Sequence, residues 1–415
     1  MCRFLRKSSY SVSTLMIVLG LGVIAAPAQA AQWSTPVQPP AGCRSTPAGA
    51  PSLAVNASGA WVVAAYAQTG SGLEAFGVSA CTSNDGVNWS GPIVIGQGTS
   101  PAVAIAPDGH AVAVWQGGPA TAPNIQASTR PASGNWSAPV VVSTLPGHPL
   151  IGMDGNGNAI AVWAGTTLAT PVATATLPAG GNWTATNTLV AQAGGIGLAT
   201  NSVGGVIVGW RTHSGAIQAA FGSILHGFAA PVTLGSAYGG IFPVQIALND
   251  AGAASFAWRS NSASNNVVTR TPDGAWTGVT KLSSANAAGI DTAIDRAGNA
   301  IVAFAVTRWI FAVTQWSTNT LTYASLRPTG GTWGVPTLLS GPNDKGGVCV
   351  AGDPAGTFVV SWNDSAGNVE AVTSSPGGGF GPSAPVGAAP TRQLIVIPGQ
   401  AVLWTAAGLS TKPVN

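Results

Sequence analysis

Charged residues are scarce in this chain of 415 amino acids: Lys and Arg together number 15, and Asp and Glu number 12. Three of the basic residues, Arg3, Arg6 and Lys7, lie at the extreme N-terminus, and without them the charges balance at 12 of each sign. A domain with no net charge lacks the electrostatic footprint of a nucleic-acid-binding protein. We therefore expect no nucleic-acid partner.

After the N-terminal segment the chain has no long hydrophobic run. A membrane-spanning helix needs about 18 consecutive apolar residues, and no later stretch reaches that length. We therefore expect no membrane span. The N-terminus combines the three basic residues with an apolar run from Leu15 to Ala26 and a small-residue site at Ala28-Gln29-Ala30, which is typical of a secretory signal. The sequence predicts a signal peptide at 1–30 and a single domain at 31–415, secreted to the periplasm or the cell exterior.

Cysteine and histidine are rare as well. Three cysteines follow the predicted signal: Cys43, Cys81 and Cys349. In an oxidising compartment this number predicts one disulfide and one free thiol. The four histidines show no metal-ligand spacing: His110, His148, His213 and His226. We expect neither a metal nor a cofactor.

The chain is rich instead in a pattern that recurs about every 47 residues. A glycine opens the second strand of each of eight units, at Gly59, Gly109, Gly157, Gly204, Gly252, Gly298, Gly356 and Gly399. Six residues later stands an aromatic residue in most units: Trp115, Trp163, Trp210, Trp258, Phe304 and Trp362. Three residues before the glycine most units have an Asx: Asn56, Asp154, Asn201, Asn249, Asp295 and Asp353. An Asx followed by a glycine with positive φ is typical of a tight turn between two strands.

The segments between these turns alternate small apolar and polar residues, as in Ala111-Val112-Ala113-Val114-Trp115, which predicts about four short antiparallel strands per unit. Repeated four-stranded units of this size pack radially and bury both faces of each sheet. The sequence therefore predicts an all-β chain that forms a β-propeller of eight blades, with seven as the alternative count.

The two ends of the predicted domain complement each other. Residues 32–37 resemble the fourth strand of a unit, whereas 393–412 resemble strands one to three. The N-terminal strand is therefore expected to complete the C-terminal blade, which removes exposed sheet edges. The sequence leaves the cysteine pairing open, but that closure would bring Cys43 near Cys349, which makes these two cysteines the candidate pair for the disulfide.

The conserved aromatic position has two interpretations. A Trp at the end of each second strand is more often a packing residue between blades than a sugar-binding platform. Polar residues beside it nevertheless recur at the rim where loops between strands two and three meet the connections between units. The candidates for ligand binding at this rim are Gln126, Arg211, Gln218, Arg259, Tyr323 and Glu370. Amide, guanidinium and aromatic groups are those that hold sugars.

Unit six departs from the repeat by about ten extra residues between its second and third strands, from Thr307 to Asn319. We expect this insertion to be an exposed loop, and either a lid over the channel or a binding site. The residues chosen for a binding site are Arg308, Trp309, Trp316 and Tyr323.

The turn before the fourth strand resembles the Asp-box of sialidase-like propellers, Ser-x-Asp-x-Gly-x-Thr-Trp. Its closest copy is Thr82-Ser83-Asn84-Asp85-Gly86-Val87-Asn88-Trp89, and other units retain Gly-x-Trp alone. The resemblance implies a fold and not an activity, because the box lies away from the active site in that family. The tyrosine nucleophile, its glutamate and the arginines of a sialidase cannot be assigned here by motif.

These observations predict a secreted, non-catalytic binding or adhesion module that recognises carbohydrate in the manner of a lectin. A divergent sialidase-like glycoside hydrolase is the alternative, and a protein-docking scaffold is the third option. Glycans of a cell surface or the extracellular space, or another protein, are the expected partners.

Overall fold

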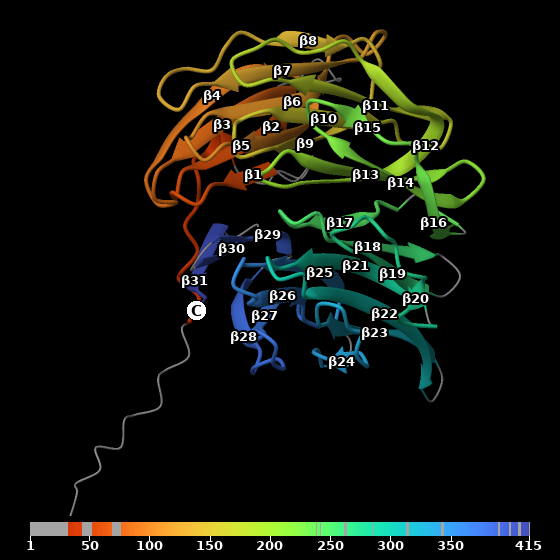
Figure 1. The fold of residues 1–415 in the computed structure, drawn as a ribbon. Coiled ribbons are helices and arrows are strands. Elements are labelled where there is room, and N and C mark those ends of the chain that lie inside the picture. The colour runs from red at the N-terminus through yellow and green to blue at the C-terminus, as the bar shows by residue number, and fades with distance from the viewer. Residues whose placement is uncertain are drawn as a thin grey trace, which may run out of the picture. The chain divides into compact units, whose positions relative to one another are not determined.

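A computed structural model of the chain describes residues 32–43, 52–68, 76–237, 239–240, 242–260, 264–284, 286–312, 315–341, 344–388, 391–397, 400–405 and 408–414. The predicted signal peptide lies outside these residues. The described part consists of β-strands, turns and one short 3-10 helix, η1 (Ala41–Cys43) (Figure 1). The prediction of an all-β chain is therefore confirmed.

The described strands form seven hydrogen-bonded sheets, one of which, with eight strands, spans two sequence repeats; we number the repeats along the chain as units 1 to 8. Unit 1 contains β1 (Ser52–Val55), β2 (Trp61–Gln68), β3 (Phe76–Ser83) and β4 (Trp89–Gln97). Unit 2 contains β5 (Thr99–Ile105), β6 (Ala111–Gly117), β7 (Asn124–Arg130) and β8 (Val140–Ser143). Unit 3 contains β9 (His148–Met153), β10 (Ala159–Ala164), β11 (Thr170–Leu177) and the first part of β12 (Asn187–Thr200). Unit 4 contains the rest of β12, β13 (Gly205–Thr212), β14 (Ala216–Ser223), β15 (Gly227–Phe228) and β16 (Val232–Ser236).

The second half of the chain repeats this order. Unit 5 contains β17 (Gln245–Leu248), β18 (Ala254–Ser260), β19 (Ser264–Arg270) and β20 (Thr280–Lys281). Unit 6 contains β21 (Ala287–Ile294), β22 (Ala300–Ala312), β23 (Gln315–Arg327) and β24 (Thr337–Leu338). Unit 7 contains β25 (Gly346–Gly352), β26 (Phe358–Asn363), β27 (Asn368–Thr373) and β28 (Ala384–Ala388). Unit 8 contains β29 (Thr391–Ile397), β30 (Gln400–Thr405) and β31 (Gly408–Pro413).

The first strands of the units lie next to one another in chain order. β1 contacts β5, β5 contacts β9, and the series continues through β12, β17, β21 and β25 to β29, which in turn contacts β1. The side chain of Gln393 on β29 links the last pair, because it accepts from the Leu53 amide at 3.0 Å and donates to the Leu53 carbonyl at 2.9 Å.

The N-terminal segment lies beside β31. Val37 and Leu409 exchange two backbone hydrogen bonds of 2.8 Å, and the amide of Ser34 donates to the carbonyl of Thr411 at 2.8 Å. Unit 8 thus has three strands of its own and an N-terminal neighbour at its outer edge.

Turns between first and second strands follow the predicted Asx pattern and also link units. In Asn56, Oδ1 accepts from the Ala60 amide at 2.9 Å, while Nδ2 donates to the Ala106 carbonyl of unit 2 at 2.9 Å. Asn201 and Asn249 donate in the same way to the turn of the following unit, at 2.8 and 3.0 Å. Each of these asparagines therefore caps its own turn and holds the next sheet.

The buried tryptophans confirm the packing interpretation. Trp115, Trp163, Trp210, Trp258 and Trp362 are each at most 2% exposed. A side chain at Gly96 of unit 1 would collide with the Trp115 ring of unit 2. A Cβ at Gly235 of unit 4 would stand 2.6 Å from the Trp258 ring of unit 5. Glycine on the fourth strand therefore makes room for the tryptophan of the next unit.

The candidate pair of Cys43 and Cys349 is wrong. Cys43 is bonded to Cys81, with Cα atoms 6.1 Å apart, and Cys349 is free. The reason is local: η1 contacts β2, β3 and β4, so Cys43 lies against the β3 strand that carries Cys81. Cys349 lies on β25 in unit 7.

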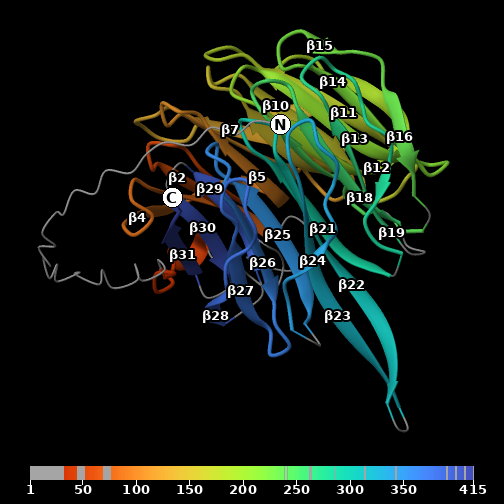
Figure 2. The same ribbon diagram turned by 60° about the horizontal axis from the view of Figure 1, so that its bottom comes forward.

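The prediction of a loop in unit 6 is also wrong. Its extra residues continue β22 and β23 as one regular hairpin, with an unbroken register from Ala300↔Arg327 to Ala312↔Gln315. Figure 2 shows this hairpin extending beyond the other strands. Arg308 is exposed on β22, whereas the side chains of Trp309 and Trp316 lie outside the described residues.

The turn that resembles an Asp-box is held by a different residue from the one aligned to the motif. Oδ1 of Asp85 accepts from the amides of Val87 and Asn88 at 2.8 and 2.7 Å. These hydrogen bonds, those from Asn88 foremost, hold the pKa of Asp85 well below its usual range. Asn84, at the motif's Asp position, is exposed.

Candidate functional site

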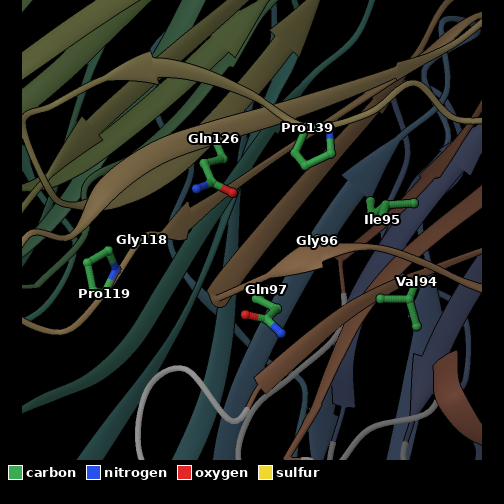
Figure 3. A pocket seen from close by; sticks show the side chains of 8 residues that line it. All are labelled: Val94, Ile95, Gly96, Gln97, Gly118, Pro119, Gln126 and Pro139. Atoms are coloured by element: carbon green, nitrogen blue, oxygen red, sulfur yellow. The ribbon is translucent and has the colours of Figure 1, made fainter.

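The gap between units 1 and 2 contains a pocket of about 600 Å³ (Figure 3). Unit 1 contributes Val94, Ile95, Gly96 and Gln97 from β4, and unit 2 contributes Gly118, Pro119, Gln126 and Pro139. The pocket opens where the end of a fourth strand meets the loop between strands two and three. This is the rim at which the sequence analysis expected ligands.

Strand register fixes the position of Gln126 in this pocket. Trp115 on β6 and Gln126 on β7 are direct cross-strand partners, so both side chains emerge on the same face of the sheet. The indole Nε1 of Trp115 donates to the backbone carbonyl of Gln97 at 3.0 Å and so binds unit 2 to unit 1. The side chain of Gln126 makes no hydrogen bond to any described residue, which leaves its donor and acceptor free.

In other units the residue paired with the second-strand tryptophan makes different hydrogen bonds. Gln218 faces Trp210, but its Oε1 accepts from the indole Nε1 at 3.1 Å and its Nε2 donates to Thr233 at 3.3 Å. Trp163 faces Ala173, and its buried Nε1 lacks a partner among the described residues. Of the two glutamines at this position, only Gln126 offers a free amide.

The walls of the pocket combine amides with apolar surface. Gln97 and Gln126 supply carbonyl and NH₂ groups, while Pro119 and Pro139 are exposed and Val94 is 69% exposed. Figure 3 shows Gln126 and Pro139 on one side and Gln97, Ile95 and Val94 on another. A compact molecule with both hydroxyl groups and an apolar face matches such walls, because amides both donate and accept while aliphatic groups cover C–H surface.

The two candidate arginines are engaged elsewhere. Arg211 is 8% exposed, and its Nε donates to the Ala237 carbonyl at 3.1 Å. Arg259 donates to the Ala288 carbonyl at 2.8 Å, and its guanidinium lies 3.5 Å from the centre of the Phe242 ring. Both residues hold the connections between units; Arg211 is buried and Arg259 is half-buried.

Tyr323 and Glu370 also occupy the register position opposite the conserved aromatic residue. Tyr323 faces Phe304, and the two rings stack with centroids 5.7 Å apart. Glu370 faces Trp362, and burial raises its pKa, with smaller contributions from the charges of Asp364 and Asp344. The candidates therefore occupy equivalent places on separate sheets and do not converge on one centre.

The sequence analysis named one of the eight residues that line the pocket, Gln126, and missed the other seven, among them Gln97, Pro119 and Pro139. Pro139 belongs to a visible pattern, because a proline also stands three residues after the turn aromatic at Pro92, Pro231 and Pro336. Gln97 carries no such signal, since it ends a strand that varies between units.

No cluster of His, Cys, Asp and Glu that could hold a metal ion occurs in the described ranges. The described residues also include no helix with the length and apolarity needed to cross a membrane.

No family model matches the sequence, and no curated protein matches it. Solved structures similar to the chain include the lectin BP39L from Burkholderia pseudomallei, with 15% identity, a TM-score of 0.54, and coverage of 81% of this chain and 99% of the lectin. A fucose-specific lectin from Aleuria aurantia has 14% identity and a TM-score of 0.40 over 69% of this chain and 95% of its own. A Hadza microbial sialidase has 12% identity and a TM-score of 0.39 over 61% of this chain and 62% of its own. The likeness to the Burkholderia lectin and the four-stranded antiparallel sheets show that the chain has a propeller-like fold.

Proposed function

We propose that this protein is a secreted, non-catalytic carbohydrate-binding module, and that the pocket between units 1 and 2 holds a saccharide. The observation that carries the proposal is the free amide of Gln126, held opposite a fully buried tryptophan in a pocket of about 600 Å³ with proline and valine walls. The similarity to lectins of propeller-like fold agrees with it but adds only the fold.

The chemistry of a pyranose fits these walls. One face of the sugar ring is rich in C–H groups and can lie on Pro119, Pro139 or Val94, while its hydroxyls can exchange hydrogen bonds with Gln97 and Gln126. Neither amide carries a charge, so a neutral sugar is the expected ligand. A single site of this kind binds weakly, and several copies on one target surface would be needed for strong attachment.

The proposal includes a ring of eight blades closed by the N-terminal strand. It is supported by the series of first-strand contacts that returns from β29 to β1, and by the hydrogen bonds between Val37 and Leu409. A closed ring keeps the wall from unit 1 at a fixed distance from the wall from unit 2. Such preorganisation reduces the entropy that binding must overcome.

Secretion rests on the leader at 1–30. N-terminal sequencing of protein exported by a bacterial host is expected to begin near Ala31, and export of the uncleaved chain or its retention in the cytoplasm would contradict this part of the proposal.

The function is tested with a glycan array on residues 31–415 and on two matched variants. Gln126→Ala removes the free amide, whereas Gln218→Ala removes an amide already bonded to Trp210 and Thr233. We expect wild type and Gln218→Ala to bind the same neutral glycans, and Gln126→Ala to lose them by about tenfold or more. If folded wild-type protein binds no glycan, the proposal is overturned. If Gln126→Ala binds glycans as well as wild type does, the saccharide site is not in this pocket.

A further inference from the structure

A cation recurs at the end of the third strand in half of the units. Four residues share one register position, opposite an alanine two residues after the turn glycine: Arg130, Arg270, Arg327 and Lys412. In unit 8, Lys412 donates to Thr373 Oγ1 of unit 7 at 3.2 Å. The cation therefore faces the third strand of the preceding unit.

Unit 5 shows what this position can hold. Nη1 of Arg270 donates to the Gly252 carbonyl at 2.7 Å, and its guanidinium carbon lies 3.8 Å from the centre of the Phe221 ring of unit 4. Asp273 adds a favourable charge in the same turn. The guanidinium is thus stacked on an aromatic ring supplied by the neighbouring sheet, which is a cation–π arrangement.

Phe221 is the aromatic member of its register series. The residues at the same position, opposite the residue three places after the turn glycine, are Thr82, Thr129, Thr176, Thr269, Leu326, Thr373 and Thr411. The gap between units 1 and 2 therefore has the cation, Arg130, but has Thr82 in place of the ring.

A second cavity lies where that ring would be. It has a volume of about 250 Å³, and both Thr82 and Arg130 line it. Arg130 makes two long hydrogen bonds of 3.4 Å, to the carbonyls of Pro131 and Ala132 in its own turn. Compared with Arg270, it lacks a short hydrogen bond and a stacked ring among the described residues.

We infer that the cavity lined by Thr82 and Arg130 binds a phenyl ring with a polar substituent, such as the phenol of a tyrosine or of a small phenolic compound. The ring takes the place that Phe221 fills beside Arg270. Asn84 is exposed at the cavity wall. Asp108 also lines the cavity; its Oδ1 accepts from the His110 amide at 2.9 Å, and its Oδ2 can accept a hydrogen bond from a phenol hydroxyl. A plain phenyl group would leave these polar groups unused.

This cavity is separate from the proposed saccharide pocket. Gln126 and Arg130 stand four residues apart on β7 and on the same face of the sheet, so the two sites are about 13 Å apart along one strand. Neither inference depends on the other. If the protein binds a saccharide but no phenol, or a phenol but no saccharide, one inference is supported and the other is overturned.

The test is a titration of residues 31–415 with phenol, N-acetyl-tyrosinamide and cyclohexanol, followed by protein-detected NMR. We expect saturable binding of the two aromatic probes and none of cyclohexanol, which has a ring of similar size without π electrons. If N-acetyl-tyrosinamide binds more tightly than phenol, the natural ligand is a tyrosine side chain of another protein. If the two bind equally, the natural ligand is a free phenolic compound. Absence of saturable aromatic binding, or equal binding of cyclohexanol, would overturn the inference.

Two variants and a matched control locate the site. Thr82→Phe should fill the cavity, abolish phenol binding and raise the melting temperature by stacking on Arg130, and Arg130→Gln should weaken phenol binding about tenfold without filling the cavity. Thr129→Phe places the same ring in the gap between units 2 and 3, where Leu177 replaces the cation, and should leave phenol binding unchanged. Phenol binding that survives both Thr82→Phe and Arg130→Gln would overturn the assignment.

Discussion

The gap between units 1 and 2 and the gap between units 4 and 5 share a framework but differ in their contents. In both, a buried tryptophan donates to a carbonyl at the end of the preceding fourth strand: Trp115 to Gln97 at 3.0 Å, and Trp258 to Ser236 at 3.2 Å. In both, the third strand carries an amide and, four residues later, an arginine. The backbone frame of the two gaps is therefore equivalent.

The side chains decide which gap is open. In the gap between units 4 and 5, Asn266 is 7% exposed and donates to Ser264 Oγ at 2.9 Å, and Arg270 is stacked on Phe221. In the gap between units 1 and 2, Gln126 and Arg130 line two cavities. The comparison teaches that tryptophan and glycine specify the fold, while polar residues at two register positions specify where a ligand can enter.

The largest expected effect tests the shared framework. Trp115→Ala and Trp258→Ala should each lower the free energy of unfolding by about 3–5 kcal/mol, because each removes a fully buried indole and leaves a cavity. Chemical denaturation followed by circular dichroism measures both. A loss below about 1 kcal/mol in only one variant would break the equivalence of the two gaps.

The disulfide sharpens the comparison, because unit 1, which forms one wall of the open gap, is cross-linked on its other face, where Cys43 and Cys81 pack with Val402 and Leu409 of unit 8. Cys81 precedes Thr82 on β3, and its bond to Cys43 spans 38 residues. Replacing both cysteines with serine should lower the free energy of unfolding by about 4 kcal/mol in the chain-entropy model. Thermal melting of wild type with and without reductant checks this, and an unchanged melting temperature on full reduction would contradict it.

The two glutamines should separate stability from binding. Gln218→Ala leaves the buried Trp210 Nε1 without its acceptor and should lower the free energy of unfolding by about 1–3 kcal/mol. Gln126→Ala removes no protein hydrogen bond and should change it by less than about 0.5 kcal/mol. The same denaturation experiment measures both, and equal losses would show that the Gln126 amide is not free.

The last prediction concerns a pH-dependent link in a third gap, between units 6 and 7. Asp291 on β21 accepts from the Val350 amide of unit 7 at 2.7 Å, and burial raises its pKa to about 7. Because the unfolded value is about 3.9, the folded state binds more protons between these values. The contribution of this carboxyl to the free energy of unfolding should therefore be largest below about pH 4 and fall as pH rises toward 7, by up to about 1.4 kcal/mol per pH unit.

Asp291→Asn is the control for that pH dependence. Subtracting the free energy of unfolding of this variant from that of wild type at each pH isolates the contribution of the Asp291 carboxyl. The equivalent link between units 8 and 1 is made by Gln393, which does not titrate, and is therefore expected to add no pH dependence. A difference profile that rises with pH between 4 and 7 would contradict the raised pKa.

Much of the fold follows from local sequence. The turn glycines and Asx residues mark the ends of strands, and the tryptophans mark their buried faces, so strand pairing and the positions opposite each tryptophan could be predicted. The unit 6 hairpin could not, because Thr307–Asn319 has the composition of an exposed loop and its register depends on long-range pairing. The cysteine pairing could not be predicted either, because η1 brings Cys43 back to β3, and no sequence pattern indicates this contact.

The candidate site was predictable only in part. Gln126 and Gln218 are the same residue at the same register position, and sequence alone treats them alike. What separates them is whether the tryptophan donates to a neighbouring backbone carbonyl or to the glutamine itself. Likewise, Arg130 and Arg270 differ through Phe221, a residue of another unit.

The most direct test of the open gap is a crystal structure of residues 31–415 bound to the glycan that binds best on the array. The account predicts a sugar between units 1 and 2, with a hydroxyl within hydrogen-bonding distance of the Gln126 amide and a ring face on Pro119, Pro139 or Val94. A sugar bound at any other place, with the Gln126 amide bonded to protein, would contradict it.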